Sequence, residues 1–380
     1  MDRLPDEAQL DFSQQLHAKY SEVPSYLDEE PIWSPYLHSG EEFKRIIELQ
    51  KALQNGLSAV LHFYAGSRNL RSLVPLSNQA SYLFETDIDL TKQFIRPDYI
   101  FDQDGELRIC EINTRFIFNG NIAAVHMAEF LAGRGFKHDT SNYQSLDNFM
   151  HRAYDGPDKT SIVVGVEPFH DLLLQKQRCL DGKFITPQQL LEQSTESIGK
   201  VILELHQHEL EPIAATLANM IDDGVVFYND PRVVWLLHDK RLLVALSDIE
   251  FMTDLIGKSD AEFLAAHIVE SYHPKWPGRE PERMIGKFAL AKKSVSGKND
   301  GLVVVPIRAY NEVLELPDDF VYQPKYRQPV QLSSTGERLE IAGTLPMTLG
   351  GEVFGPGIVR LMPHASLRRF SGFTVAMAGQ

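Results

Sequence analysis

The 380-residue chain has few cysteines, no long apolar run and no block of basic residues. Its two cysteines, Cys110 and Cys179, form at most one disulfide and lack the CxxC spacing of metal sites, which indicates reduced thiols. No apolar run reaches the length of about 18 residues that a membrane span needs, and the first residues lack the apolar core of a signal peptide. We therefore expect a soluble, cytoplasmic protein.

The charge balance is acidic, with 37 Lys and Arg against 52 Asp and Glu and a formal net charge of −15. Nucleic-acid backbones and anionic lipid surfaces attract basic residues, so this balance argues against a nucleic-acid or membrane partner. The G-x-S-x-G elbow, the Walker A loop and the G-x-G-x-x-G fingerprint are also missing. Any active site must therefore be assembled from other motifs.

The chain does contain apolar strands that alternate with amphipathic helices, a pattern typical of an α/β fold with an open parallel sheet. Its length suits two or three packed lobes. Helices are predicted over residues 41–64, 121–133, 188–194, 209–222 and 240–272. Strands are predicted over residues 161–166, 200–205 and 224–228, with further short strands in 285–330 and 331–374.

The sharpest local pattern is a β-hairpin. Apolar strands at residues 99–101 and 107–112 flank Asp102-Gln103-Asp104-Gly105, and Asp-Gly between two such runs predicts a tight turn. Residues two apart on a strand point to the same side, so Glu111 and Asn113 are expected to project together.

The neighbouring arm of the hairpin is expected to bring Asp98 alongside Glu111 and Asn113. Two carboxylates and one amide oxygen form the hard oxygen set that Mg²⁺ takes when it also holds phosphates. Arg96 and Arg115 would provide charge-assisted contacts to a transferring phosphoryl group. The alternative is a hairpin with solvent-facing charges, which explains Glu111 and Asn113 poorly because their neighbours are apolar.

The pattern from Arg96 to Arg115 (R-x-D, a D-G turn, then E-x-N-x-R) resembles the magnesium edge of ATP-grasp enzymes. Its place ahead of the candidate nucleotide lobe is similar to the circularly permuted branch, typified by glutathionylspermidine synthetase. The residues after Asn113 look more like those of the unpermuted branch. The sequence shows no cysteine-peptidase domain, so the resemblance does not imply hydrolysis of a glutathione amide.

Downstream segments resemble the ATP-binding lobe of the same family. An apolar segment ends at Lys240, a second strand ends at Lys292-Lys293, and a loop with glycines follows that strand. The strand register is unknown, so which lysine of the pair meets the phosphates stays open. The residues that the resemblance assigns to ATP are Lys240, Lys292, Lys293, Gly297, Gly301 and Gln323.

The resemblance implies a circularly permuted ATP-grasp fold with a pre-ATP-grasp-like α/β layer. The regions it implies are an N-terminal region at 1–85, the first part of the catalytic lobe at 86–157, the α/β layer at 158–235, an ATP lid at 236–330 and closing strands at 331–380.

The implied activity is an ATP- and Mg²⁺-dependent carboxylate–amine ligase that forms an amide through an acyl phosphate and releases ADP and phosphate. Arg96, Arg115 and Arg360 would contact the transferred phosphoryl group. The partners would be a small-molecule carboxylate and an amine, and a homodimer is compatible with this interpretation. Two alternatives are a phosphotransferase acting on a small molecule and a nucleotide-binding regulator without turnover.

Weaker candidates lie elsewhere. Arg68 and Arg71 are candidates to bind the carboxylate substrate, with a surface loop as the alternative. His206 and His208 are two apart, which suits zinc, with an exposed polar strand edge as the alternative. Asp171, with the histidine before it, belongs either to a substrate site or to an ordinary loop.

Overall fold

The computed structural model describes residues 2–116, 118–136, 140–154, 160–166, 171–179, 182–194, 198–284, 287–295, 302–307, 317–363 and 372–378. The protein is a mixed α/β structure with several sheets, which confirms the predicted class. Within these ranges no helix combines the length and the apolar character that crossing a membrane requires. Both cysteines are free thiols, as predicted.

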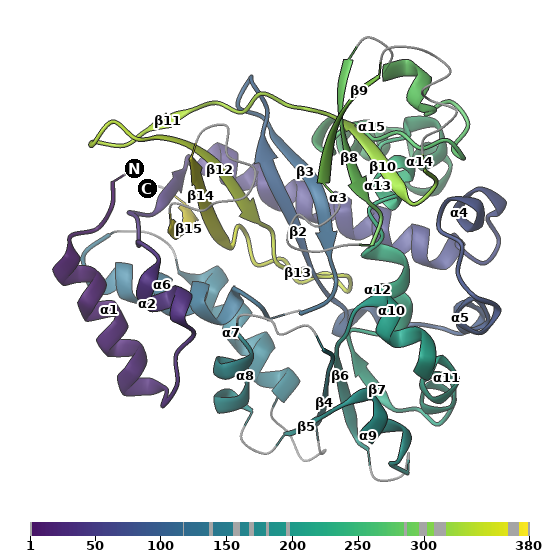
Figure 1. The fold of residues 1–380 in the computed structure, drawn as a ribbon, viewed down its shortest axis with the longest axis horizontal. Helices are drawn as coiled ribbons and strands as arrows, with labels where there is room; N and C mark the ends of the chain where they lie inside the picture. The colour runs from purple at the N-terminus through teal and green to yellow at the C-terminus, as the bar shows by residue number, and fades with distance from the viewer. Residues whose placement is uncertain are drawn as a thin grey trace.

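The largest sheet has eight strands and runs through the centre of the molecule (Figure 1). Its order is β1-β15-β14-β12-β2-β13, while β3 pairs with β2 and β11 pairs with β12. The bounds are β1 (Tyr36–His38), β2 (Phe94–Phe101), β3 (Leu107–Asn113), β11 (Gln331–Leu332), β12 (Arg338–Thr344), β13 (Met347–Thr348), β14 (Ile358–Pro363) and β15 (Gly372–Ala378). Strands from residues 94–113 thus share one sheet with strands from the C-terminal part of the chain.

A long helix, α3 (Gly40–Phe63), packs against one face of this sheet and confirms the helix predicted at 41–64. It begins with a capping box: Ser39 Oγ accepts a hydrogen bond from the Glu42 backbone N–H at 3.2 Å, and the Glu42 carboxylate accepts one from the Ser39 N–H at 2.7 Å. Its apolar stripe is buried in the core that also contains Tyr99 and Ile109.

A second sheet has four parallel strands in the order β5-β4-β6-β7 and lies at the bottom of Figure 1. The strands are β4 (Thr160–Val164), β5 (Lys183–Ile185), β6 (Lys200–Glu204) and β7 (Val226–Tyr228). Its helices are α8 (Leu172–Arg178), α9 (Pro187–Leu191), α10 (Gln207–Leu210), η4 (Glu211–Ile213) and α11 (Ala214–Asp222). Every residue of β6 is buried, as expected for a parallel strand that is covered on both faces. The predicted parallel layer is confirmed.

A third, antiparallel sheet has the order β10-β8-β9 and lies at the upper right of Figure 1. Its strands are β8 (Lys287–Lys293), β9 (Leu302–Ile307) and β10 (Phe320–Pro324). The helices before it are α12 (Pro231–Leu237), α13 (Leu242–Leu246), α14 (Ile249–Ile256) and α15 (Lys258–His267), followed by η5 (Pro281–Met284). The segment predicted as helical over 240–272 is thus split, because Asp248 caps α14 and Gly257, with φ +84°, separates α14 from α15.

Two stretches without a predicted helix are helical in the structure. The first forty residues contain helices α1 (Asp6–Lys19) and α2 (Ser25–Glu29), and α1 buries Phe12 against α6 (Asn121–Gly133). Further along the chain lies α7 (Ser141–Tyr154). Its apolar residues pack in the core that also contains α6.

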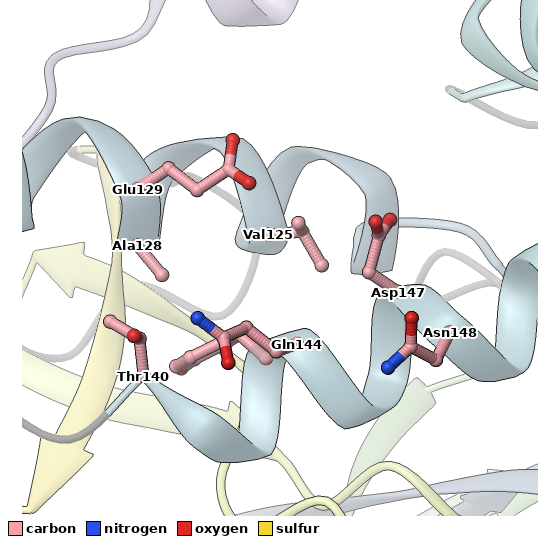
Figure 2. Close-up of a pocket in the computed structure, with 8 residues that line it drawn as sticks. Val125, Ala128, Glu129, Thr140, Gln144, Asp147 and Asn148 are labelled. Carbon is pink, nitrogen blue, oxygen red and sulfur yellow. The ribbon is translucent and has the colours of Figure 1, made fainter.

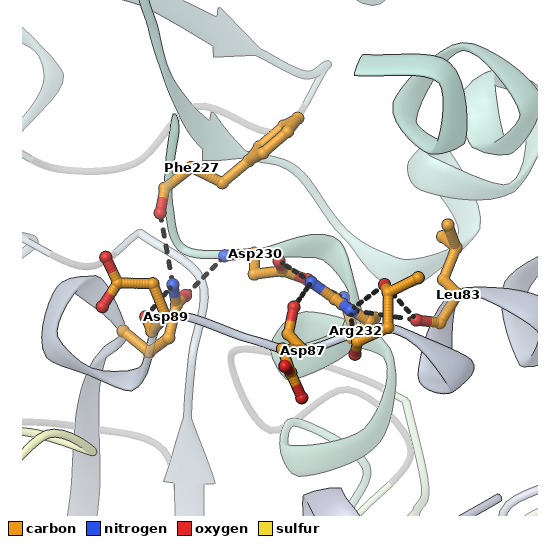
Figure 3. Close-up of polar contacts among 8 residues, drawn as sticks. Leu83, Asp87, Asp89, Phe227, Asp230 and Arg232 are labelled. Carbon is orange, nitrogen blue, oxygen red and sulfur yellow. Dashed lines mark hydrogen bonds and ion pairs between the residues drawn. The ribbon is translucent and has the colours of Figure 1, made fainter. Parts of the chain in front are cut away.

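A buried arginine fastens residues 83–87 to the start of α12 (Figure 3). Arg232 donates to both oxygens of Asp230, from Nε at 2.8 Å and from Nη2 at 2.7 Å. It also donates to the carbonyl oxygens of Leu83 at 2.9 Å, Thr86 at 2.8 Å and Asp87 at 3.1 Å. The short helices of this region are α4 (Arg68–Leu73), α5 (Asn78–Tyr82), η1 (Leu83–Glu85) and η2 (Leu90–Lys92).

The boundaries of the five predicted regions stay a prediction. Arg232, at the end of the predicted α/β layer, donates to Leu83 and to Thr86. These two residues lie on either side of the predicted boundary at position 85.

Candidate functional site

The hairpin β2–β3 places two carboxylates directly opposite each other. Asp98 pairs with Glu111 and Arg96 pairs with Asn113, so all four side chains belong to one end of the hairpin. The turn closes at Gly105, whose φ of +82° lies in the left-handed region that glycine adopts freely. The structure therefore brings Asp98, Glu111 and Asn113 together.

A β-bulge sets which residues face this site. The register shifts between Asp98 and Tyr99, because Tyr99 pairs with Ile109 and leaves Cys110 as the extra residue. Ile109 and Ile112 are both buried in the core, whereas Glu111 between them is half-buried. In a regular strand, Ile109 and Glu111 would point to the same face. Because of the bulge, Ile109 points into the core while Glu111 points to the candidate site.

Two lysines approach Glu111 from the third sheet and its helices. Lys240 Nζ lies 3.2 Å from Glu111 Oε1, and the Lys240 backbone N–H donates to the Ser294 carbonyl at 3.0 Å. Lys292 Nζ donates to the Cys110 carbonyl at 3.4 Å. Lys292 is half-buried, whereas Lys293 is exposed. The structure thus brings Lys292 to the strand that carries Glu111.

Two arginines lie on the other side of the pair. Arg96 Nε is 3.8 Å from Asp98 Oδ1, and Arg96 Nη1 donates to the Asn119 carbonyl. Arg360, on β14, is close enough to both residues to affect the pKa of Asp98 and of Arg96. These positions bring together two of the arginines predicted to meet a phosphoryl group.

The two carboxyl groups have pKa values that move in opposite directions. Burial raises the pKa of Asp98, and Arg96 and Arg360 offset only part of that effect. Burial also acts to raise the pKa of Glu111, but Lys240 and Lys292 outweigh it and hold that pKa below its usual value. Glu111 is therefore the residue that stays ionised most readily.

The donor set fits a magnesium ion. Asp98 Oδ1 is buried and accepts no hydrogen bond within the described ranges, which leaves an oxygen that a cation would satisfy. Glu111 faces it across the ladder, and Asn113 lies two residues further along β3, opposite Arg96. Among the residues described, no three or more His, Cys, Asp or Glu side chains are grouped as a metal site. Mg²⁺ beside phosphates usually takes only one or two carboxylates, so this does not conflict with the prediction.

Arg115, which follows β3, contacts His206, which follows β6. Arg115 is buried just beyond β3 and donates from Nε to His238 Nε2 at 2.9 Å, while Arg115 Nη1 contacts His206 Nε2. His206 is therefore buried, and the alternative of an exposed polar edge is wrong for it, although His208 is exposed. The sequence signal for His206 was its place at the end of a buried strand.

The remaining predicted residues lie apart from the cluster. Gln323 is buried on β10 and donates to Ser271 Oγ at 3.0 Å. Arg68 and Arg71 lie exposed on α4, at the right edge of Figure 1, and the structure does not bring them to the carboxylates. Their exposure agrees with the alternative that these two arginines lie on the protein surface and do not bind substrate. Gly297 and Gly301 lie outside the described residues.

The cavity drawn in Figure 2 is not this site. It has a volume of about 280 Å³ and lies between α6 and α7, where Glu129, Gln144 and Asp147 line it. It borders none of the predicted site residues. The candidate site is therefore defined by the charged cluster and not by this cavity.

Asp171, which the sequence left open between a substrate site and an ordinary loop, is a buried acid. Its carboxylate accepts hydrogen bonds from Tyr26 Oη at 2.5 Å and from the Gly120 N–H at 2.6 Å. Burial raises the pKa of Asp171 to about 6, and Arg96 and Arg360 act against that rise. The histidine before it lies outside the described residues.

Asp171→Asn is expected to change the pH dependence of stability. The folded pKa of about 6 exceeds the ordinary 3.8, so the contribution of Asp171 is fully present below 3.8 and is lost as the pH rises through 6. The wild type should therefore lose roughly 2 kcal/mol relative to Asp171→Asn between about pH 4 and pH 7. Urea unfolding of both proteins at the two pH values measures this, and a constant difference would contradict it.

Comparison with known families gives a match over part of the chain. Residues 49–236, a little less than half of the chain, match the family described as the AnkG N-terminal domain. The matched range contains the β2–β3 hairpin and the parallel sheet, but it ends before Lys240, Lys292 and Arg360. No curated protein matches the chain. The chain is thus similar over this range to the AnkG N-terminal domain, and the resemblance to ATP-grasp enzymes stays a prediction.

Proposed function

We propose that the protein is an ATP- and Mg²⁺-dependent carboxylate–amine ligase of the circularly permuted ATP-grasp kind. The observation that carries the proposal is the pair of opposed carboxylates, Asp98 and Glu111, with cationic side chains on both sides. Those cations are Lys240, Lys292, Arg96 and Arg360. A cluster of this composition matches what transfer of a phosphoryl group requires, namely metal ligands beside positive charge.

The architecture also supports the proposal. Strands from residues 94–113 and from the C-terminal part complete one sheet, beside a parallel α/β sheet and a small antiparallel sheet. In the proposed arrangement these are the catalytic lobe, the pre-ATP-grasp-like layer and the ATP lid. ATP would lie between the lid and the catalytic lobe, the usual kind of place between domains.

Each residue of the cluster has a proposed task. Lys240 and Lys292 would bind phosphate oxygens, and Arg96 and Arg360 would hold the transferred group in line with its acceptor. Bound Mg²⁺, held by Asp98, Glu111 and Asn113, would neutralise charge on the phosphate oxygens. The side chains are fixed before substrate arrives, because Arg96 is buried and Lys240 is anchored through its backbone to Ser294.

The proposed reaction has two steps. A substrate carboxylate oxygen attacks the γ-phosphorus of ATP, and the bond to the β-phosphate oxygen breaks, which releases ADP. An amine then attacks the acyl carbon, and phosphate leaves as the amide forms. A carboxylate alone is a poor electrophile, so the acyl phosphate divides one difficult step into two easier ones. The choice of an amine as acceptor rests on the family resemblance.

Lys240→Ala and Lys292→Ala are each expected to weaken MgATP binding about tenfold or more. Removing a charged partner of phosphate from a partly dry site costs roughly 1.5–3 kcal/mol. Lys293→Ala is the matched control on the same strand and should leave the affinity nearly unchanged, because Lys293 is exposed. Calorimetric titration with MgATP measures all three, and unchanged affinity in both Lys240→Ala and Lys292→Ala would contradict the assignment of the lid.

A substrate screen tests the proposed activity. Pools of amino acids, polyamines and short peptides, supplied with MgATP, should yield ADP together with a new amide mass. A phosphorylated product without an added amine would identify a phosphotransferase instead. Binding of MgATP with no turnover over all pools would favour the nucleotide-binding regulator.

A further inference from the structure

Arg115 is held from three sides by side chains that come from different parts of the fold. His206 follows the end of β6, His238 directly follows α12, and Phe116 is the next residue in the chain. Arg115 Nε donates to His238 Nε2 at 2.9 Å, and Arg115 Nη1 contacts His206 Nε2. The guanidinium carbon lies 4.6 Å from the centre of the Phe116 ring. An arginine with this many restraints has little rotational freedom left.

The tautomer of His238 is fixed by the backbone. His238 Nδ1 lies 3.2 Å from the Ile112 carbonyl oxygen, which can only accept, so the proton is on Nδ1. Nε2 therefore carries the lone pair that receives the Arg115 Nε–H. Burial, with Arg115 and Lys240 nearby, keeps the pKa of His238 well below its usual value, so the ring stays neutral.

The backbone beside Arg115 is also unusual. Phe116 has a φ of +50°, in the left-handed region that a bulky residue rarely adopts. Its ring packs edge-on against His206, with the centroids 5.9 Å apart. Strain of this kind persists where the surrounding contacts hold it, and it occurs often at functional sites. Here the turn directs the chain so that Arg115 and Phe116 face the same histidine.

Arg115 lies four residues after Glu111, just beyond the end of β3. It is among the cations that lower the pKa of Glu111, together with Lys240 and Lys292. The three restraints therefore fix a positive charge next to the proposed magnesium edge.

We propose that His206, His238 and Phe116 form a clamp that holds Arg115 in the orientation required for the phosphoryl group and the acyl phosphate. His206 and His238 are positioning residues, because they act through Arg115 and do not touch substrate. The catalytic part of this inference rests on the proposed function. The clamp itself rests only on the contacts of the four side chains.

A double-mutant cycle tests the clamp. His238→Leu removes the acceptor while keeping similar bulk, and His238→Gln can place its amide oxygen where Nε2 was. His238→Leu should lower kcat for ADP release about 100-fold, the scale of a misplaced catalytic group, with little change in the KM for MgATP. His238→Gln should recover most of that loss. In an Arg115→Ala background, His238→Leu should cause no further loss. Additive losses, or equal losses for the Leu and Gln variants, would overturn the clamp.

A measurement without turnover separates the clamp from the proposed activity. Nitrogen-15 NMR of labelled histidine should show His238 protonated on Nδ1 and unprotonated on Nε2. Arg115→Ala should shift the Nε2 resonance, and the Arg115-dependent signal should be absent in His238→Gln. If these signatures hold but no substrate pool yields ADP, the clamp stands and the proposed function fails. A His238 resonance protonated on Nε2, or one unchanged by Arg115→Ala, would overturn the clamp even if the enzyme turns over.

Discussion

Glu111→Gln should lower ATP turnover by orders of magnitude while the protein stays folded. The substitution keeps the shape and leaves an acceptor for Lys240 Nζ, which lies 3.2 Å from Glu111 Oε1. It removes the negative charge that would hold Mg²⁺, whose role is to offset charge during phosphoryl transfer. Asn113→Asp should also lower turnover, because an added charge beside the polyphosphate is repelled strongly in a cleft of low dielectric.

Ile112→Gln is the matched control for Glu111→Gln. Ile112 is the next residue on the same strand, but it is buried in the core. A buried amide without partners costs about 1–3 kcal/mol, in addition to the lost packing. Ile112→Gln should thus lower the melting temperature more than Glu111→Gln and leave turnover per folded molecule closer to normal. Near-normal turnover of Glu111→Gln would mean that the proposed metal site does not exist.

Arg232→Met should have the largest effect on stability of any single change considered. The side chain is 2% exposed, and it donates hydrogen bonds to the Asp230 carboxylate and to three backbone carbonyls (Figure 3). Methionine is of similar length but leaves the Asp230 carboxylate buried without its partner, which typically costs 3–5 kcal/mol. Urea unfolding measures the loss, and residues 83–87 should become more accessible to proteases.

Arg241→Met provides the control for the Arg232 prediction. Arg241 and Asp239 repeat the same spacing and pairing, with Nε to Oδ1 at 3.0 Å and Nη2 to Oδ2 at 2.7 Å. Within the described residues, the Arg241 side chain makes one further hydrogen bond, to the Asp318 carbonyl at 3.4 Å. Arg232 donates to about two more backbone carbonyls than Arg241, and each such hydrogen bond contributes about 1 kcal/mol net. Arg241→Met should therefore lower the free energy of unfolding by roughly 2 kcal/mol less than Arg232→Met. Equal losses would show that the carbonyl contacts of Arg232 add no stability.

The sequence was sufficient for the features that follow from local patterns. The Asp-Gly turn predicted the hairpin, and apolar runs predicted the parallel strands and helix α3, because both depend on residues close in the chain. The hairpin predicted that Asp98 lies beside Glu111 and Asn113, but the direct pairing of Asp98 with Glu111 depends on the bulge at Cys110.

Features that depend on tertiary contacts could not be predicted from the sequence. The bulge at Cys110 depends on packing of Ile109 into the core, and an alternating pattern cannot reveal it. The approach of Lys292, the burial of Asp171 against Tyr26 and the meeting of Arg115 with His206 each join segments far apart in sequence. Helix α7 was missed because its polar face dominates the composition of the segment.

The most direct test of the proposed ligase is trapping of an acyl phosphate. Wild-type protein with MgATP, a pool of carboxylic acids and hydroxylamine, but no natural amine, should form ADP and a hydroxamate in equal amounts. Glu111→Gln under the same conditions should form neither above background. AMP and pyrophosphate as the products, or ADP without any hydroxamate over all acids tested, would contradict transfer of the γ-phosphoryl group to a carboxylate.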